Sequence, residues 1–229
     1  MSEALDNPIW HALSGPHQRF AIGDGLARQY PRDMAPFAGI ENTTAAAYAD
    51  LAASLPSNTE ARLFRPADEP LPAGWTKVDA FPMLQMIAKS APAEAADSAR
   101  FSTLSSTDVG AMLELVNVAK PGPFDRRTPE LGCYVGVWTD GRLMAMAGER
   151  IRVPGYVELS GIATHPDARG QGLASHLTVE LMRIAFARDE IPFLHVRAGN
   201  PAIPLYQRLG FETRRAIWVL WRKPIGTGV

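Results

Sequence analysis

The segment from residue 156 to residue 188 constrains the fold more than any other part of the sequence. It begins with YVELSGIAT, a mostly apolar run typical of a strand, and continues through a turn that contains Gly170 and Gly172. Apolar residues then recur at helical spacing, at Leu173, Leu177, Leu181 and Ile184. The sequence therefore predicts a strand, a glycine turn and an amphipathic helix that ends near Arg188.

A glycine turn at the start of a helix favours the binding of an anion. The first N–H groups of a helix have no partner within it, and the helix dipole favours negative charge there. Glycines let a ligand approach the backbone, and Arg169 adds a permanent cation suited to phosphate. The plainer interpretation is that the glycines only form a turn. Neither the P-loop pattern nor G-x-G-x-x-G is present.

The other elements after residue 100 indicate a mixed α/β domain. Asp140 and Gly141 predict a tight hairpin turn, and Asn200, Pro201 and Gly210 predict the start and end of a helix. We expect helices at 106–119, 173–188 and 200–210, and strands at 132–138, 142–153, 156–164, 193–198 and 216–223. Their order along the chain is α-β-β-β-α-β-α-β.

The first hundred residues have a different character, rich in proline and alanine. They predict a helix at 43–55, capped by Thr43 or Thr44, a strand at 60–66, and a helix at 83–91. The small, polar segment 90–100 is interpreted as a linker. We therefore expect an N-terminal α/β region at 1–97 and a second domain at 98–229.

Composition narrows the class of protein. The chain has 229 residues, 46% hydrophobic and 21% charged, with a formal net charge of −1. This balance argues against a general nucleic-acid binder, and no apolar run is long enough to span a membrane. The acidic N-terminus, broken by Pro8, is unlike a signal peptide. Cys133 is the only cysteine, so we expect a packed thiol, no cysteine-rich zinc site and a cytoplasmic location.

Two motifs resemble one known family. Residues 169–174, RGQGLA, are similar to the Q/R-x-x-G-x-G/A signature of the GNAT acyltransferase superfamily, which binds acetyl-CoA. Residues 200–211, NPAIPLYQRLGF, resemble the superfamily's second element. The resemblance covers about residues 101–225 and implies a GNAT-like fold with splayed central strands, preceded by a smaller α/β region. Because some members carry a degenerate half of the fold ahead of the catalytic domain, one is expected at 1–97.

The resemblance also implies where acetyl-CoA binds. The pyrophosphate is expected on the backbone of the turn, formed by Arg169, Gly170, Gln171, Gly172, Leu173 and Ala174. The pantetheine arm is expected to pair with the open strand edge at Ile162, Ala163 and Thr164. A backbone N–H there is a candidate to polarise the thioester carbonyl. Asn200 either hydrogen-bonds CoA or only caps its helix.

Acetyl transfer to a primary amine requires a base and an acid. Tyr206 matches the tyrosine that many members place near the CoA sulfur, where it protonates the leaving thiolate; the alternative is a packed tyrosine. Glu158 is the first candidate for the base, with a pKa raised by its apolar strand. Glu149 and a water chain are the rivals. The plainer alternative for both glutamates is an ion pair with Arg150 or Arg152.

The remaining polar residues leave several interpretations open. His195 either lines the acceptor site or is a satisfied, buried histidine, and His165 is expected to be structural. No metal is expected, because the histidines show no ligand spacing. The loop 119–132, with Arg126, Arg127 and Glu130, either reads the charge of the acceptor or is solvated.

We expect a small-molecule amine as acceptor, without naming it, and neither nucleic acid nor membrane as partner. A homodimer is common in the superfamily and stays open here. The alternative function is a non-catalytic acyl-CoA-binding sensor or partner-binding module.

Overall fold

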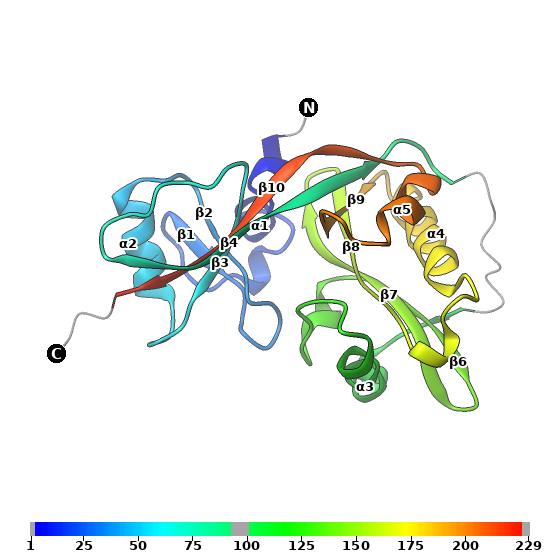
Figure 1. Ribbon diagram of the computed structural model, residues 1–229. Coiled ribbons are helices and arrows are strands. Elements are labelled where there is room, and N and C mark those ends of the chain that lie inside the picture. The colour runs from blue at the N-terminus through cyan, green and yellow to red at the C-terminus, as the bar shows by residue number, and fades with distance from the viewer. Residues whose placement is uncertain (1–2, 93–100, 226–229) are drawn as a thin grey trace.

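Two long antiparallel strands run side by side across the whole molecule (Figure 1). They are β4, Trp75–Ala88, and β10, Phe211–Pro224, and they pair along their full length. They belong to an eight-stranded sheet with the order β3-β10-β4-β9-β8-β7-β6-β5. The computed structural model describes residues 3–92 and 101–225. Strands from both sequence regions therefore share one sheet.

The second region contains the expected order of elements and short additions. Its strands are β5 Ser102–Thr103, β6 Tyr134–Thr139, β7 Arg142–Val153, β8 Tyr156–Thr164 and β9 Ile191–Arg197. Its helices are α3 Val109–Ala119, α4 Leu173–Phe186 and α5 Ile203–Arg208, with 3-10 turns at Ser106–Asp108, Thr128–Leu131 and Pro166–Ala168. Asp140 and Gly141 both have positive φ, 50° and 76°, which confirms the tight hairpin turn between β6 and β7.

The central strands β8 and β9 are paired over only part of their length. They form a parallel ladder at Tyr156, Val157 and Glu158, opposite Ile191, Pro192 and Phe193. Beyond Glu158, β9 pairs with β4 while β8 pairs only with β7. The edge of β8 that faces β9 is therefore open from residue 159 onward. This confirms the expected mixed α/β fold with splayed central strands.

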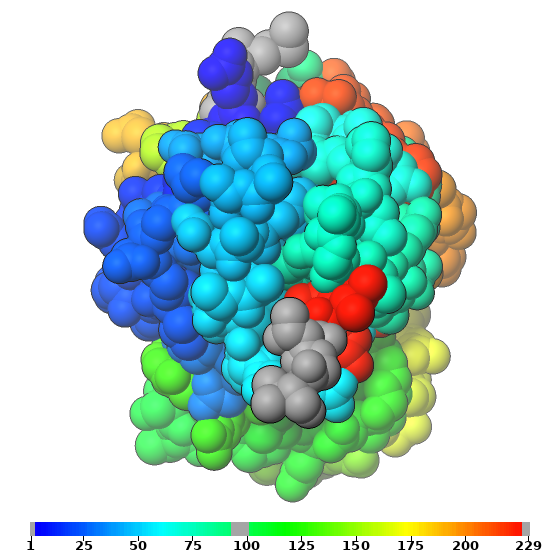
Figure 2. All heavy atoms as spheres, turned by 90° about the vertical axis from the view of Figure 1, so that its left-hand side faces the viewer, coloured from blue at the N-terminus to red at the C-terminus, as the bar shows by residue number. Residues whose placement is uncertain are grey.

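The N-terminal region builds the other end of the molecule. It contains the helices α1 Pro8–Leu13 and α2 Ala45–Ser54, the strands β1 Ala27–Gln29, β2 Ala38–Ile40 and β3 Ala61–Arg65, and 3-10 turns at Glu3–Asp6 and Gln18–Phe20. The hydroxyl of Thr44 accepts a hydrogen bond from the Ala47 N–H at 3.3 Å, as expected of a cap. In Figure 2 the end of β10, in red, emerges between segments of this region.

Two expected helices differ from the structure. Residues 83–88 belong to β4 instead of a helix, because their backbone pairs with β9 on one side and β10 on the other. A short apolar run does not distinguish a buried strand from a helix, so long-range pairing decided the outcome. Helix α5 begins at Ile203, later than expected, and Asn200 Oδ1 instead accepts the Ala202 N–H at 2.8 Å in the preceding turn.

The core supports the sheet from the side of α4. Leu173, Leu177 and Leu181 of this helix are at most 8% exposed and pack on the sheet, as their spacing predicts.

Cys133 is partly buried, and burial raises the pKa of its thiol, which fits a packed, unreactive cysteine. In the described residues, no helix is both long enough and apolar enough to cross a membrane. Most of the expected linker, 90–100, and the boundary at 97/98 lie outside the described residues.

Candidate active site

A cavity of about 650 Å³ opens where β8 and β9 separate. Its size is that of a typical small-molecule site. One side consists of β8, the turn before α4, and the start of α5: Leu159, Ser160, Gly161, Ile162, Ala163, Thr164, Arg169, Asn200, Pro201, Ala202 and Tyr206. The other side comes from the residue before β2 and from β3, β4, β9 and β10: Phe37, Arg62, Phe64, Phe81, Met83, Leu194, His195, Val196, Arg197, Val219 and Trp221. Residues 119–123 and Arg150 complete the lining.

The predicted glycine turn has the geometry that an anion requires. Gly172 is the N-cap of α4 at φ 75°, and no side chain caps the helix. Gly170 has φ 77°, and a Cβ atom added there would meet no atom within 4 Å. Only Arg169 of the six turn residues borders the cavity; Gly170, Gln171 and Gly172 are exposed beside it. Leu173 is buried and anchors the helix. The first N–H groups of α4 are thus left for a ligand.

The open edge of β8 is deformed where it borders the cavity. Gly161 and Ile162 stand opposite the single residue Ala147 of β7, which is a β-bulge, and Gly161 has φ 61°. The hydroxyl of Thr164 is buried and has no hydrogen-bond partner among the described residues. Ile162, Ala163 and Thr164 all line the cavity. This edge offers unpaired backbone groups to an extended ligand.

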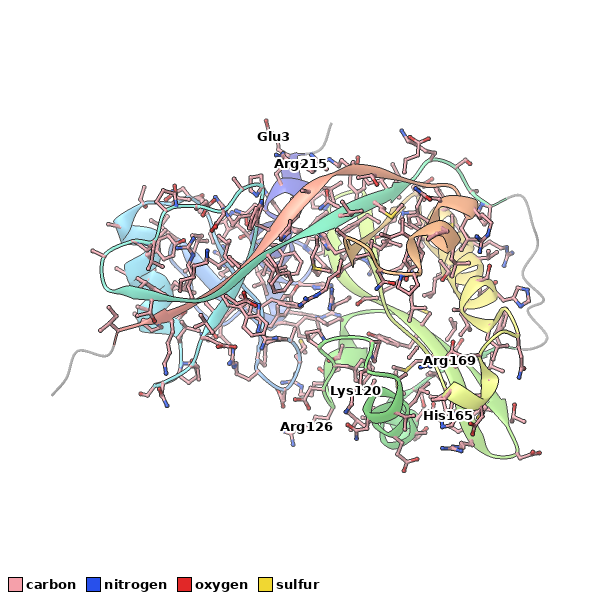
Figure 3. All side chains as sticks on the ribbon, in the orientation of Figure 1. Glu3, Lys120, Arg126, His165, Arg169 and Arg215 are labelled. Atoms are coloured by element: carbon pink, nitrogen blue, oxygen red, sulfur yellow. The ribbon has the colours of Figure 1, made fainter. Side chains whose placement is uncertain are left out.

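Tyr206 and Asn200 border the cavity from the segment that follows β9. Tyr206 is 9% exposed, and burial raises the pKa of its phenol. Its ring packs on Phe211 at 6.1 Å between centroids. Two cationic residues of the lining, Lys120 and Arg169, are labelled in the lower part of the molecule in Figure 3.

Glu158 sits at the point where β8 and β9 separate, in a fully hydrogen-bonded network. The guanidinium of Arg150 binds it through two hydrogen bonds, Nε to Oε2 at 2.9 Å and Nη2 to Oε1 at 2.8 Å. His195 Nδ1 lies 2.8 Å from Oε1. Burial opposes the charged form, but the charge of Arg150 and these hydrogen bonds outweigh it and lower the pKa of Glu158 to about 2.

The expectation of a raised pKa at Glu158 is therefore wrong. Spacing along the strand indicated its apolar neighbours, but the arginine beside it on β7 determines its protonation. The plainer alternative, an ion pair with Arg150, is what the structure contains.

His195 is hydrogen-bonded at both ring nitrogens. Its Nε2 lies 3.0 Å from Nε2 of Gln85, an amide nitrogen that also donates to the Leu5 carbonyl at 2.8 Å. Because the amide donates, we assign the ring proton to Nδ1, which then donates to Glu158. The side chain is fully buried, although the residue borders the cavity. His195 thus matches the satisfied, buried alternative.

Glu149 lies outside the cavity lining in a second buried network. It accepts hydrogen bonds from Arg152 at 2.9 Å, from the Cys133 N–H at 3.1 Å and from Arg188. Neither candidate base borders the cavity, and its described lining contains no aspartate or glutamate. It does contain five cationic side chains: Arg62, Lys120, Arg150, Arg169 and Arg197.

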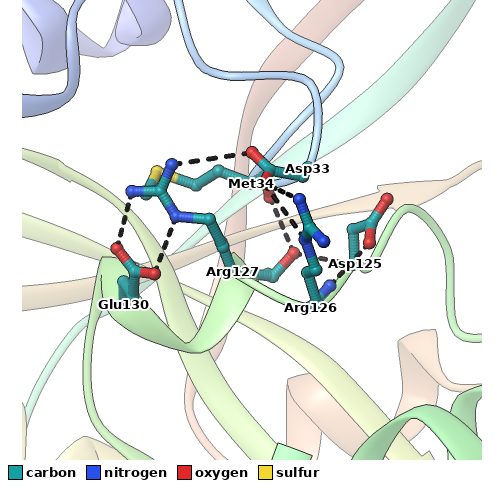
Figure 4. Close-up of polar contacts among 7 residues, drawn as sticks. Asp33, Met34, Asp125, Arg126, Arg127 and Glu130 are labelled. Atoms are coloured by element: carbon teal, nitrogen blue, oxygen red, sulfur yellow. Dashed lines mark hydrogen bonds and ion pairs between the residues drawn. The ribbon is translucent and has the colours of Figure 1, made fainter. Parts of the chain in front are cut away.

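The loop after α3 borders the cavity, but its charged side chains form ion pairs with other residues of the protein. Arg126 pairs with Asp33 at 2.9 Å, and Arg127 pairs with Glu130 at 2.8 Å and with Asp33 at 3.6 Å (Figure 4). The hydroxyl of Thr128 donates to the carbonyl of Met34 at 2.7 Å. These contacts fasten the loop to the N-terminal region, while residues 120–123 face the cavity. The three charged residues that were candidates for reading the acceptor therefore bind the protein itself.

His165 is buried, and its ring contacts Arg142 and the N–H of Asp167, which fits the expected structural role. Within residues 3–92 and 101–225, no group of three or more His, Cys, Asp or Glu side chains has the arrangement of a metal site.

Sequence reasoning missed the side of the cavity formed by Phe37, Arg62, Phe64, Phe81 and Trp221. Arg62 and Phe64 lie on β3, and the others come from β4, β10 and the residue before β2, so together they form no motif. The expected strand 60–66 was the available signal, because alternate residues of a strand share a face and Arg62 and Phe64 are two positions apart.

Comparisons with known proteins agree with this fold. Residues 104–211 match the model of the acetyltransferase (GNAT) family. A solved protein from Novosphingobium aromaticivorans, described as an acetyltransferase from the GNAT family, is 37% identical, with a TM-score of 0.88 over 97% of this chain and 99% of its own. A conserved protein of unknown function from Staphylococcus epidermidis, 12% identical, shares the fold at a TM-score of 0.55 over 88% of this chain and 92% of its own.

A curated relative is matched over a shorter stretch. The cysteine-rich protein 2-binding protein of Mus musculus is 36% identical over 59 residues, which are 26% of this chain and 7% of that protein. The match therefore covers a small part of that relative. The match to the family model and the near full-length relative together show that the chain belongs to the GNAT family of acetyltransferases.

Proposed function

We propose that this protein transfers an acetyl group from acetyl-CoA to a primary amine, with both substrates bound in the cavity at the splay. The observation that carries the proposal is that one cavity has two independent sides. The open edge of β8 leads to the uncapped start of α4, and a separate wall of apolar and cationic side chains faces it. Direct attack of one substrate on another needs both in one enclosed space.

Acetyl-CoA fits the side formed by β8 and α4. The pyrophosphate fits the N–H groups at the start of α4, with the guanidinium of Arg169 beside it. The pantetheine amides fit the open edge at Ile162, Ala163 and Thr164, whose buried hydroxyl lacks a partner among the described residues. The bulge at Gly161 and Ile162 frees backbone N–H groups to stabilise the oxyanion that forms when the amine attacks.

The amine must lose its proton before it attacks, and water is the base that the lining favours. A carboxylate with a pKa of about 2, as at Glu158, accepts a proton poorly near neutral pH. The cationic side chains on the wall act instead on the substrate, because like charges disfavour its ammonium form and lower its pKa. Glu158 is then a positioning residue that holds Arg150 and His195 where β8 and β9 separate.

Tyr206 supplies the proton that the leaving thiolate requires. Its raised pKa keeps the phenol protonated near neutral pH, and it borders the cavity beside Asn200. A phenol positioned in this way contributes roughly 10²- to 10⁴-fold to the rate. The products are an N-acetylated amine and free CoA thiol.

Calorimetric titration with acetyl-CoA, followed by free-thiol release with a panel of amines, tests the proposal. We expect micromolar binding and thiol release that depends on an amine. Absence of binding by the folded protein would overturn the proposal. Binding without turnover of any amine would favour the sensor alternative.

A further inference from the structure

Four neighbouring strands place a row of cationic and aromatic side chains on one wall of the cavity. In the order of the sheet they are Arg62 on β3, Trp221 on β10, Phe81 on β4 and Arg197 on β9. The Arg62 guanidinium lies 3.8 Å from the ring centre of Trp221, and that of Arg197 lies 4.1 Å from the ring centre of Phe81. The two rings meet edge to face at 6.3 Å.

The two arginines of this row have little anionic compensation. Within the described residues, the only partner of the Arg197 side chain is the ring of Phe81, and Arg197 is exposed. The only acidic partner of Arg62 there is the partly exposed Glu60, at 3.2 Å. A guanidinium stacked on a ring uses its face and leaves the N–H donors of its edge available. These donors match the two oxygens of a carboxylate.

We infer that the acceptor is a small amino acid, an amine that carries a carboxylate and an apolar body. This inference rests on the proposed function, because it assigns the substrate class of the same site. Arg197 holds the carboxylate, and Arg62 adds positive charge at the other end of the row. The apolar body packs on Phe81 and on Met83, which lies opposite Arg197 in the register of β4 and β9.

The same wall discriminates against other amines. A polyamine or a lysine-rich tail brings further positive charges to a lining that, as described, contains no carboxylate and four cations besides Arg150, whose charge Glu158 balances. Like charges within one cavity repel each other and weaken binding. An amine of the same shape that lacks the carboxylate cannot form the ion pair with Arg197.

The test is thiol release from acetyl-CoA with the standard amino acids and with the matching amino-acid amides, which keep the amine and side chain but lack the carboxylate. We expect kcat/KM for at least one amino acid to exceed that for its amide by about 10- to 100-fold. Arg197→Gln should remove this difference by lowering kcat/KM for the acid alone. Arg197→Lys should restore part of it, and Arg183→Gln, on the exposed side of α4, is the matched control.

Calorimetry with acetyl-CoA separates this inference from the proposed function. We expect an unchanged dissociation constant in Arg197→Gln. Weaker acetyl-CoA binding in that variant would assign Arg197 to the co-substrate and overturn the inference. Equal rates with acids and amides, or no turnover of either set by protein that binds acetyl-CoA, would overturn it as well. Failure of the wild type to bind acetyl-CoA would instead overturn the proposed function.

Discussion

The two sides of the cavity are built in different ways. The side proposed for acetyl-CoA comes mainly from one continuous stretch, the end of β8, the glycine turn and the start of α4. The opposite side takes its residues mainly from four strands, β3, β10, β4 and β9, whose order in the sheet is unrelated to their order in the chain. In the proposed function the local stretch binds acetyl-CoA through its backbone, whereas the distributed wall binds the acceptor through side chains. We therefore expect substitutions of single side chains in the wall to alter the acceptor without disturbing the co-substrate.

The largest effect is expected from a carboxylate placed in the glycine turn at residues 169–174, because it tests directly whether that turn binds the co-substrate. In Gly172→Glu a side chain with negative charge points at the start of α4, and we expect acetyl-CoA affinity to fall more than about 100-fold. Calorimetric titration measures the loss. Gly155→Glu is the matched control, because Gly155 has nearly the same φ, 77° against 75°, and lies in the turn at the opposite end of β8. Equal losses in both variants would show that the turn contributes only its fold.

Glu158 joins the two sides, and its substitution tests the junction. Glu158→Gln leaves Arg150 charged and buried without its partner, and we expect a loss of about 3–5 kcal/mol in the free energy of unfolding at pH 7. Urea denaturation measures this loss. The double variant Arg150→Met, Glu158→Leu should lose much less, because it removes both charges.

The pH dependence of stability follows from the same network. The pKa of Glu158 is about 2 when folded, against an ordinary value of 4.5. Its contribution is therefore fully present above about pH 4.5 and disappears as the pH falls toward 2. Denaturation curves at pH 7 and pH 3 should show a smaller difference between wild type and Glu158→Gln at pH 3. A difference independent of pH would contradict the ionised state of Glu158.

Substitution of Tyr206 tests whether the side proposed for acetyl-CoA takes part in the reaction step as well as in binding. Tyr206→Phe removes only a hydroxyl, and we expect kcat to fall roughly 10²-fold while the dissociation constant of acetyl-CoA stays the same. Steady-state thiol release with the best acceptor provides the measurement. An unchanged kcat would remove Tyr206 as the proton donor and favour the packed-tyrosine interpretation.

The smallest effect is expected at the ion pairs of Asp33 with Arg126 and Arg127, which hold the loop after α3 against the N-terminal region. Asp33→Asn weakens exposed ion pairs with Arg126 and Arg127, so the melting temperature should stay close to that of the wild type. The acetyl-CoA dissociation constant should not change. Thermal denaturation at low and high salt checks this. A large fall in melting temperature would contradict this expectation and show that these ion pairs stabilise the contact between the loop and the N-terminal region.

The sequence predicts the local part of this site well. The strand, glycine turn and helix of 156–186 all form, because spacing, glycine positions and apolar periodicity act over a few residues. The same holds for the hairpin at Asp140 and Gly141. Thr44 caps its helix for the same reason.

The distributed part could not be predicted in this way. Residues 83–88 have the composition of either a helix or a buried strand, and only pairing with β9 and β10 decides between them. The protonation of Glu158 depends on Arg150 and His195, which reach it from neighbouring strands. Strand order places Arg62, Phe81, Arg197 and Trp221 in one row, and no spacing along the chain records that order.

Hydrogen–deuterium exchange with and without acetyl-CoA tests the central claim most directly, because it reports each side of the cavity separately. We expect slower exchange in residues 159–174 when acetyl-CoA is bound, with β3 and the middle of β4 unchanged. Slower exchange in β3 and β4 with none in 159–174 would contradict the assignment of the two sides.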